Sequence, residues 1–82
     1  MSTGKTIVDV RTVQEFNMAN AAGSINIPLQ EIQHRLEEIK LLDQPIILCC
    51  ASGNRSGQAA LFLQGYGIDC ENGGSWTDVH VN

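Results

Sequence analysis

Residues 46–57 carry the stretch IILCCASGNRSG, which reads as a strand, a short loop and the start of a helix. Residues 46–49 are apolar without alternation, which is typical of a parallel strand that is covered on both faces. Gly53 lets the following loop turn tightly. Residues 56–66 are rich in Ala and Leu and predict a helix, which Gly67 would close in a left-handed conformation. A strand, a loop and a helix in this order are typical of the parallel α/β folds.

The sequence before this stretch repeats the alternation of strand and helix. Residues 6–10, TIVDV, predict a short buried strand, and residues 24–27, SINI, predict a second one. Between them, Thr12 and Glu15 have the spacing of a helix N-cap and its capping-box partner. We therefore expect a short helix over residues 12–20.

Apolar residues at intervals of three and four predict a further amphipathic helix before the central strand. They are Leu29, Ile32, Leu36 and Ile39. Residues 68–70 predict an edge strand. Together the elements indicate a small three-layer α/β fold, a mainly parallel sheet flanked by helices, with a single domain over residues 1–82. Ligands of such sheets bind beyond the carboxyl ends of the strands, which is where the loop after residue 49 lies.

Composition limits the classes of partner. The 82-residue chain has a formal net charge of −4 and 43% hydrophobic residues, as expected for a globular protein. An acidic chain with few Lys and Arg residues fits neither nucleic acid nor an anionic membrane as a partner. The sequence has no apolar run of the roughly 18 residues that a spanning helix needs. It shows no signal peptide, so we expect a cytoplasmic protein, or a periplasmic one if the sequence is a mature form.

The three cysteines, at positions 49, 50 and 70, indicate a working thiol rather than a disulfide framework. A disulfide between the adjacent Cys49 and Cys50 would be strained, and a reducing compartment suits free thiols. His34 and His80 are isolated from other ligand types, so the sequence shows no metal cluster. We predict neither a metal nor a cofactor.

The loop after the central strand has the features of an anion site. Gly53 allows successive N–H groups to point inward, and the new helix adds its unpaired N–H groups and the positive end of its dipole. Arg55 adds a fixed cation, and a thiol in this cradle becomes more acidic. Four residues separate Cys50 from Arg55, which suits sulfur chemistry, whereas five separate Cys49 from Arg55, which suits phosphate chemistry. The spacing alone leaves the nucleophile open.

Residues 50–56, CASGNRS, resemble the active-site loop of rhodanese-type thiosulfate sulfurtransferases, which has the pattern Cys-x-x-Gly-x-Arg-Ser. Residues 7–16 resemble the "DVR…EF" opening of that family, residues 23–29 its "GAINIPL" segment and residues 71–74 its closing double glycine. Residues 56–59 are most similar to the small members of the phage-shock protein E type. The chain departs from the family pattern by having ANAA in place of Gly-His-Ile-Pro before Gly23, and by lacking a first strand and helix.

The resemblance implies that Cys50 is the nucleophile. Its thiolate would take the outer sulfur of thiosulfate or a similar donor, hold it as a persulfide, and pass it to cyanide, a thiol or a protein acceptor. Arg55 would bind the sulfonate of the donor. The other residues implied to contact the substrate, mostly through backbone N–H groups, are Ala51, Ser52, Gly53, Asn54 and Ser56.

Two alternatives remain beside this enzyme. The first is a rhodanese-like binding or sulfur-relay module with little turnover of its own. The second is a small phosphatase or arsenate reductase that acts through Cys49. Leu48 argues against the phosphatase or reductase, because those enzymes usually have histidine at this position. Asp78 could act as their general acid only if the C-terminal segment folds back.

Other residues are assigned structural roles from the sequence. Asp9 and Arg11 are expected to brace loops rather than to catalyse. Cys70 is expected to be a buried strand cysteine, although a thiol there could resolve a persulfide. Trp76 is expected to cover the core.

Overall fold

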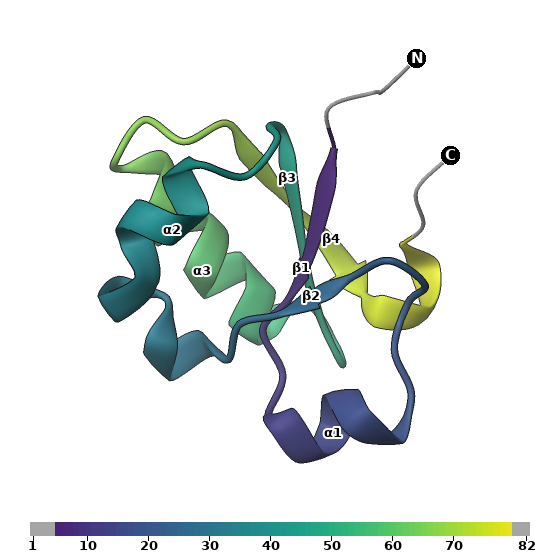
Figure 1. Ribbon diagram of the computed structural model, residues 1–82. Coiled ribbons are helices and arrows are strands. Elements are labelled where there is room, and N and C mark those ends of the chain that lie inside the picture. The colour runs from purple at the N-terminus through teal and green to yellow at the C-terminus, as the bar shows by residue number, and fades with distance from the viewer. Residues whose placement is uncertain (1–4, 80–82) are drawn as a thin grey trace.

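A computed structural model describes residues 5–79 of the chain, and an all-parallel sheet lies at the centre of these residues (Figure 1). Its strands are β1 (Thr6–Asp9), β2 (Ile25–Asn26), β3 (Ile46–Cys50) and β4 (Cys70–Ser75), in the spatial order β2-β1-β3-β4. Because β1 and β3 are parallel neighbours, the segments that follow them emerge at the same edge of the sheet. This edge carries the candidate site.

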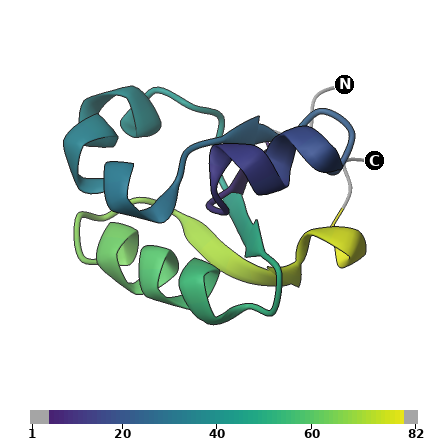
Figure 2. The same ribbon diagram turned by 90° about the horizontal axis from the view of Figure 1, so that it is seen from below.

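Helices cover the sheet unequally. They are α1 (Val13–Met18), α2 (Leu36–Lys40) and α3 (Asn54–Gln64), with single 3₁₀ turns at Leu29–Glu31, Gln33–Arg35 and Trp76–Asp78. The helices α2 and α3 pack on one face of the sheet, and the last 3₁₀ turn lies on the other (Figure 1). The helix α1 lies across the edge where β1 and β3 end, as the view from that end shows (Figure 2). The predicted parallel α/β fold is confirmed.

The alternation of β3 divides the core into two clusters. Ile46, Leu48 and Cys50 belong to the larger cluster, under α2 and α3. Ile47 and Cys49 belong to the smaller cluster on the opposite face, against which Trp76 and Val79 pack. Successive side chains of a strand point to opposite faces, so the two adjacent thiols face different layers of the protein.

The predicted amphipathic helix over residues 29–39 is wrong as a continuous helix. Its apolar residues do pack on the core, and Ile32 and Ile39 are buried. The backbone, however, makes 3₁₀ bonds from Ile32 N–H to the Leu29 carbonyl and from Arg35 N–H to the Ile32 carbonyl before α2 begins. Apolar intervals of three and four residues specify the buried face, and both 3₁₀ and α turns satisfy them.

The last strand lies further along the chain than the predicted residues 68–70, because β4 includes the double glycine. Between Leu48 and Cys49 the register with β4 shifts by one residue, which accommodates Gly73 as an extra residue. A Cβ atom at Gly73 would lie 2.7 Å from Ile47 Cγ2 and 2.7 Å from Val79 Cγ1. The strand therefore requires glycine there, although glycine rarely favours strands.

Smaller differences affect the ends of the central elements. The strand β3 runs one residue further than predicted and includes Cys50. The helix α3 begins at Asn54, two residues earlier than predicted, and ends at Gln64. Gly67 has the expected positive φ, but it lies in the turn that follows the helix. The predicted domain range of 1–82 extends beyond the described residues and stays a prediction.

Candidate active site between β3 and α3

Cys50 ends β3 and is fully buried, with its sulfur at the start of α3. Its Sγ accepts hydrogen bonds from the N–H groups of Gly53, at 3.0 Å, and Ser56, at 3.4 Å, and lies 3.3 Å from Ser56 Oγ. Burial acts to raise the pKa of the thiol, but the hydrogen bonds from Ser56, Gly53 and Ser52 outweigh it and lower the pKa from 9.0 to about 7. A large fraction of Cys50 is therefore thiolate at neutral pH.

Gly53 produces this geometry through its backbone conformation. Its φ of 100° lies in the left-handed region, which residues with a side chain rarely adopt. The turn points the Gly53 N–H at Cys50 Sγ and makes Gly53 the N-cap of α3. The Gly53 carbonyl accepts a hydrogen bond from Gly57 N–H at 2.9 Å. The eleven-residue helix α3 thus begins directly beneath the sulfur, and the positive end of its dipole favours the thiolate.

Asn72 holds the loop in place from the neighbouring strand β4. Its Oδ1 accepts from Ser56 Oγ at 2.7 Å and from Gly74 N–H at 3.0 Å, and its Nδ2 donates to the Gly53 carbonyl at 3.0 Å. One amide therefore ties the loop, the first turn of α3 and β4 together. The sequence did not predict this role for Asn72. Its position beside the double glycine was the available signal, but nothing local links it to Ser56.

Arg55, at the start of α3, forms an ion pair with Glu15 of α1. Its Nη1 donates to Glu15 Oε1 at 2.8 Å and its Nη2 donates to Glu15 Oε2 at 3.1 Å. This pairing is the largest cause of the lowered pKa of Glu15, which falls to about 2. The pair is partly exposed, with 34% and 37% of the two side chains accessible. Arg55, which was expected to bind the sulfonate of the donor, thus already binds the carboxylate of Glu15.

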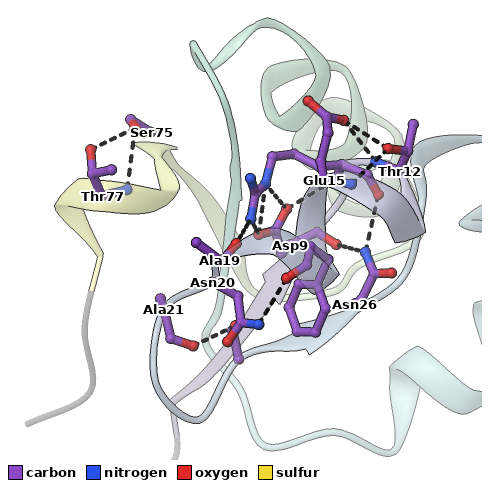
Figure 3. Close-up of polar contacts among 12 residues, drawn as sticks. Asp9, Thr12, Glu15, Ala19, Asn20, Ala21, Asn26, Ser75 and Thr77 are labelled. Atoms are coloured by element: carbon purple, nitrogen blue, oxygen red, sulfur yellow. Dashed lines mark hydrogen bonds and ion pairs between the residues drawn. The ribbon is translucent and has the colours of Figure 1, made fainter.

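Glu15 also completes the capping box that the sequence predicted for α1. Thr12 N–H donates to Glu15 Oε1 at 2.9 Å, and Glu15 N–H donates to Thr12 Oγ1 at 3.2 Å (Figure 3). The same carboxylate therefore caps its own helix and binds Arg55 on α3. The capping role was predicted, and the contact with Arg55 was not.

The remaining residues expected at the site lie around the loop. Ala51, Ser52 and Asn54 are exposed, whereas Ser56 is buried. The structure therefore brings backbone groups of Ser52, Gly53 and Ser56 to the sulfur, whereas the side chains of the exposed residues face solvent.

Asp9 and Arg11 form a buried ion pair beside the site. Arg11 Nη2 lies 2.8 Å from Asp9 Oδ2 and also donates to the Ala19 carbonyl at 2.7 Å, while its guanidinium packs over the Trp76 ring. Asn26 Nδ2 donates to the Asp9 carbonyl (Figure 3). These contacts connect β1, β2 and the end of α1, which supports the bracing role expected for the pair.

The other two thiols lie away from the loop. Burial, followed by the negative charge of Asp9, raises the pKa of Cys49 to about 12. Cys70 pairs with Ile46 at the opposite end of β3 from Cys50, and burial raises its pKa as well. Neither is placed to react at the loop.

No group of three His, Cys, Asp or Glu residues within residues 5–79 could hold a metal ion. His80, considered above as a ligand, lies outside the described residues. Over the same part of the chain, every helix is too short or too polar to cross a membrane.

Comparison with known proteins supports the same fold. The sequence model of the family described as the rhodanese-like domain matches residues 1–80 of this chain. The thiosulfate sulfurtransferase PspE of Escherichia coli is 31% identical over 74 residues, which cover 88% of this chain and 71% of that protein. The putative sulfur carrier protein YrkF of Bacillus subtilis is 38% identical over 76% of this chain but only 33% of its own length.

A solved structure of a rhodanese with anions from E. coli superposes with a TM-score of 0.77 at 30% identity, covering 92% of this chain and 91% of that one. The chain spans less than half of the length of the two B. subtilis relatives YqhL and YrkF. The match of the family model, the similarity to PspE and the shared parallel sheet agree with one another. The chain belongs to the rhodanese-like domain family.

Proposed function

We propose that the protein is a sulfurtransferase that carries sulfur as a persulfide on Cys50, taking it from thiosulfate or a similar donor. The observation that carries this proposal is the cradle of N–H groups from Gly53 and Ser56 around Cys50 Sγ. The cradle lowers the pKa of this thiol to about 7 and so supplies a nucleophile at neutral pH.

The reaction follows from the placement of the sulfur. The Cys50 thiolate attacks the outer sulfur of thiosulfate, the S–S bond of the donor breaks, and sulfite leaves with the bonding electron pair. The persulfide on Cys50 would accept hydrogen bonds from the same N–H groups, and it would lie at the positive end of the α3 dipole. Cyanide or an acceptor thiol then attacks the outer sulfur and releases Cys50 as a thiolate. Because sulfite is a stable anion, the first step needs no general acid.

The geometry gives less support to a phosphatase that acts through Cys49. The Cys49 thiol belongs to the cluster on the face of the sheet opposite Cys50, and its pKa of about 12 keeps it protonated at neutral pH. Cys50, in contrast, lies at the start of α3, and its pKa of about 7 allows its thiol to ionise near neutral pH although it is buried. A reducing compartment such as the cytoplasm would suit this chemistry, and we propose it on that ground.

Mass spectrometry of the protein after incubation with thiosulfate tests the assignment. We expect a gain of one sulfur atom in the wild type and in Cys49→Ser, and none in Cys50→Ser. Cys70→Ser serves as a control for the loss of a buried thiol. An adduct that survives Cys50→Ser and disappears in Cys49→Ser would refute the assignment.

A sulfur-relay module is the second candidate, in which a protein thiol is the true acceptor. The similarity to a putative sulfur carrier and the engagement of Arg55 by Glu15 both favour it. Steady-state turnover of thiosulfate and cyanide separates the two candidates. Fast thiocyanate production indicates the enzyme, whereas persulfide formation with almost no thiocyanate indicates the relay.

A further inference from the structure

The ion pair between Glu15 and Arg55 places a carboxylate on the guanidinium that is expected to bind the donor. Both carboxylate oxygens of Glu15 accept from the two terminal nitrogens of Arg55, at 2.8 and 3.1 Å. This is the side-by-side arrangement that a guanidinium uses for any planar or tetrahedral oxyanion. A sulfonate that used the same two nitrogens would have to displace the carboxylate.

Glu15 is also held in place independently of Arg55. Its Oε1 accepts from Thr12 N–H at 2.9 Å and from Thr12 Oγ1 at 3.1 Å, so the first turn of α1 fixes the carboxylate. The pKa of about 2 means that Glu15 carries its charge at any physiological pH. Displacing it therefore requires the loss of a helix cap as well as of an ion pair.

The charges around the loop sum to a negative value when the nucleophile is ready to react. The Cys50 thiolate and Glu15 contribute two negative charges and Arg55 contributes one positive charge. The adjacent pair of Asp9 and Arg11 is neutral as a unit. A donor that carries two negative charges is repelled about twice as strongly by this arrangement as a donor that carries one.

We propose that Glu15 is a specificity-determining residue that neutralises Arg55 and thereby disfavours dianionic sulfur donors relative to donors with a single negative charge. The inference rests on the sulfurtransferase function proposed above. It names the class of donor that suits the loop: a sulfane-sulfur compound carrying fewer charges than thiosulfate. Glu15 acts in this role through Arg55 and the local charge, not through contact with the reacting sulfur.

Two donors with the same chemistry and different charges test the proposal. Thiosulfate carries two negative charges and releases sulfite, whereas methanethiosulfonate carries one and releases methanesulfinate. In both, the Cys50 thiolate takes the outer sulfur and the leaving group keeps the electron pair of the S–S bond. The kcat/KM for the donor in such a two-step exchange is independent of the acceptor, so cyanide serves for both.

Glu15→Gln is the informative variant. Glutamine keeps an oxygen that can accept from Thr12 N–H in the capping box, but it removes the charge. At low ionic strength we expect kcat/KM to rise about tenfold for thiosulfate and about threefold for methanethiosulfonate, the order expected for one unit charge near a protein surface. Glu37→Gln removes an equal charge from an exposed site on α2 and should change neither value. An unchanged ratio between the donors, or a loss of thiosulfate activity, overturns the proposal.

The wild-type protein offers a second measurement that needs no variant. Salt screens repulsion between the loop and the donor, so added salt should raise kcat/KM for thiosulfate more than for methanethiosulfonate. A fall in thiosulfate activity with salt that exceeds the change for methanethiosulfonate would mean that the loop attracts dianions, and would contradict the proposal even if Glu15→Gln fails to fold.

Alkylation of Cys50 separates this inference from the proposed function. Iodoacetate carries one negative charge and iodoacetamide carries none, and the ratio of their rates cancels any change in the thiolate fraction. We expect Glu15→Gln to raise the ratio of iodoacetate to iodoacetamide about threefold. If neither donor leaves sulfur on the wild type while this ratio still rises, the charge preference stands and sulfur transfer fails. If the wild type forms the persulfide and neither ratio changes, only the role of Glu15 fails.

Discussion

Cys49 and Cys50 are adjacent in the chain and equally buried, yet their surroundings give their thiols opposite acidities. The pKa of Cys49 rises to about 12 because burial and the charge of Asp9 disfavour its thiolate. The pKa of Cys50 falls to about 7 because hydrogen bonds to its sulfur from Ser56, Gly53 and Ser52 outweigh the effect of burial. Burial raises the pKa of both thiols, and hydrogen-bond donors at the edge of the sheet reverse this effect for Cys50 alone.

The position of each residue in β3 explains the difference. Cys50 is the last strand residue, and its side chain lies on the face from which α3 returns, so the first N–H groups of that helix reach its sulfur. Cys49 lies one residue earlier and points to the opposite face, among Ile7, Ile47 and Trp76. A shift of one residue in β3 would exchange the two environments.

Selective alkylation gives the largest expected effect. At pH 7.5 and low iodoacetamide concentration, Cys50 should react more than about a thousandfold faster than Cys49, because the thiolate is the reactive form. Initial rates by peptide mass spectrometry measure the difference. In urea the three cysteines should react at similar rates. Faster labelling of Cys49 in the folded protein would reverse the comparison.

Asn72→Ala removes the support of the loop and should bring Cys50 closer to Cys49 in reactivity. The change leaves the Gly53 carbonyl and the Ser56 hydroxyl without the amide, so the N–H groups that hold the thiolate become less well placed. We expect the pKa of Cys50 to rise by about one unit and its alkylation at pH 7 to slow about fivefold. The pH dependence of the alkylation rate measures both quantities.

Asn17→Ala provides the matched control for this variant. Asn17 is an exposed asparagine on α1, so its loss should leave the alkylation profile of Cys50 unchanged. An Asn72→Ala protein with the wild-type profile would show that the loop holds its shape without the Asn72 amide.

The candidate site was predictable where its residues are close in sequence. The strand, Gly53 and the start of α3 are consecutive, so residues 46–57 alone indicated a thiol in an anion cradle. Asn72 was not predictable, because its contact with Ser56 depends on the register between β3 and β4. Glu15 was expected as a helix cap, but its pairing with Arg55 joins residues forty positions apart through the sheet edge.

The fold shows the same division between local and distant causes. The parallel sheet followed from apolar strands separated by helices, and it was confirmed. The segment from Leu29 to Ile39 has helical spacing, but its backbone forms 3₁₀ turns before α2, because the same spacing buries Ile32 and Ile39 in either kind of turn. The strand β4 was placed too early because Gly73 carries no strand signal, and only its crowded neighbours explain it.

Gly73→Ala tests the packing on the Cys49 face. The new methyl group would meet Ile47 Cγ2 and Val79 Cγ1, each 2.7 Å from the expected Cβ position. We expect the free energy of unfolding to fall by about 1–3 kcal/mol, as for other overpacked cores. Urea denaturation measures the loss. Glu71→Ala, at an exposed position of the same strand, should stay within about 0.5 kcal/mol of the wild type.

The two cysteines should also give stability opposite dependences on pH. The folded protein ionises Cys50 near pH 7, whereas the unfolded chain ionises it near 9.0, so the stabilisation from Cys50 grows as pH rises between these values. From pH 7 to pH 8 this contribution amounts to about 1 kcal/mol. Cys50→Ala should lack this increase when urea denaturation is followed in reducing buffer.

Cys49 should produce the reverse at higher pH. The unfolded chain ionises its thiol near 9.0, whereas the folded protein keeps it protonated to about 12, so stability falls as pH rises above 9. From pH 9 to pH 10 the loss is about 1 kcal/mol, and the difference between the wild type and Cys49→Ala isolates it from other groups that titrate there. Equal pH slopes for these two proteins would mean that Cys49 ionises as easily in the fold as outside it. The contrast between the two faces of β3 would then rest on Cys50 alone.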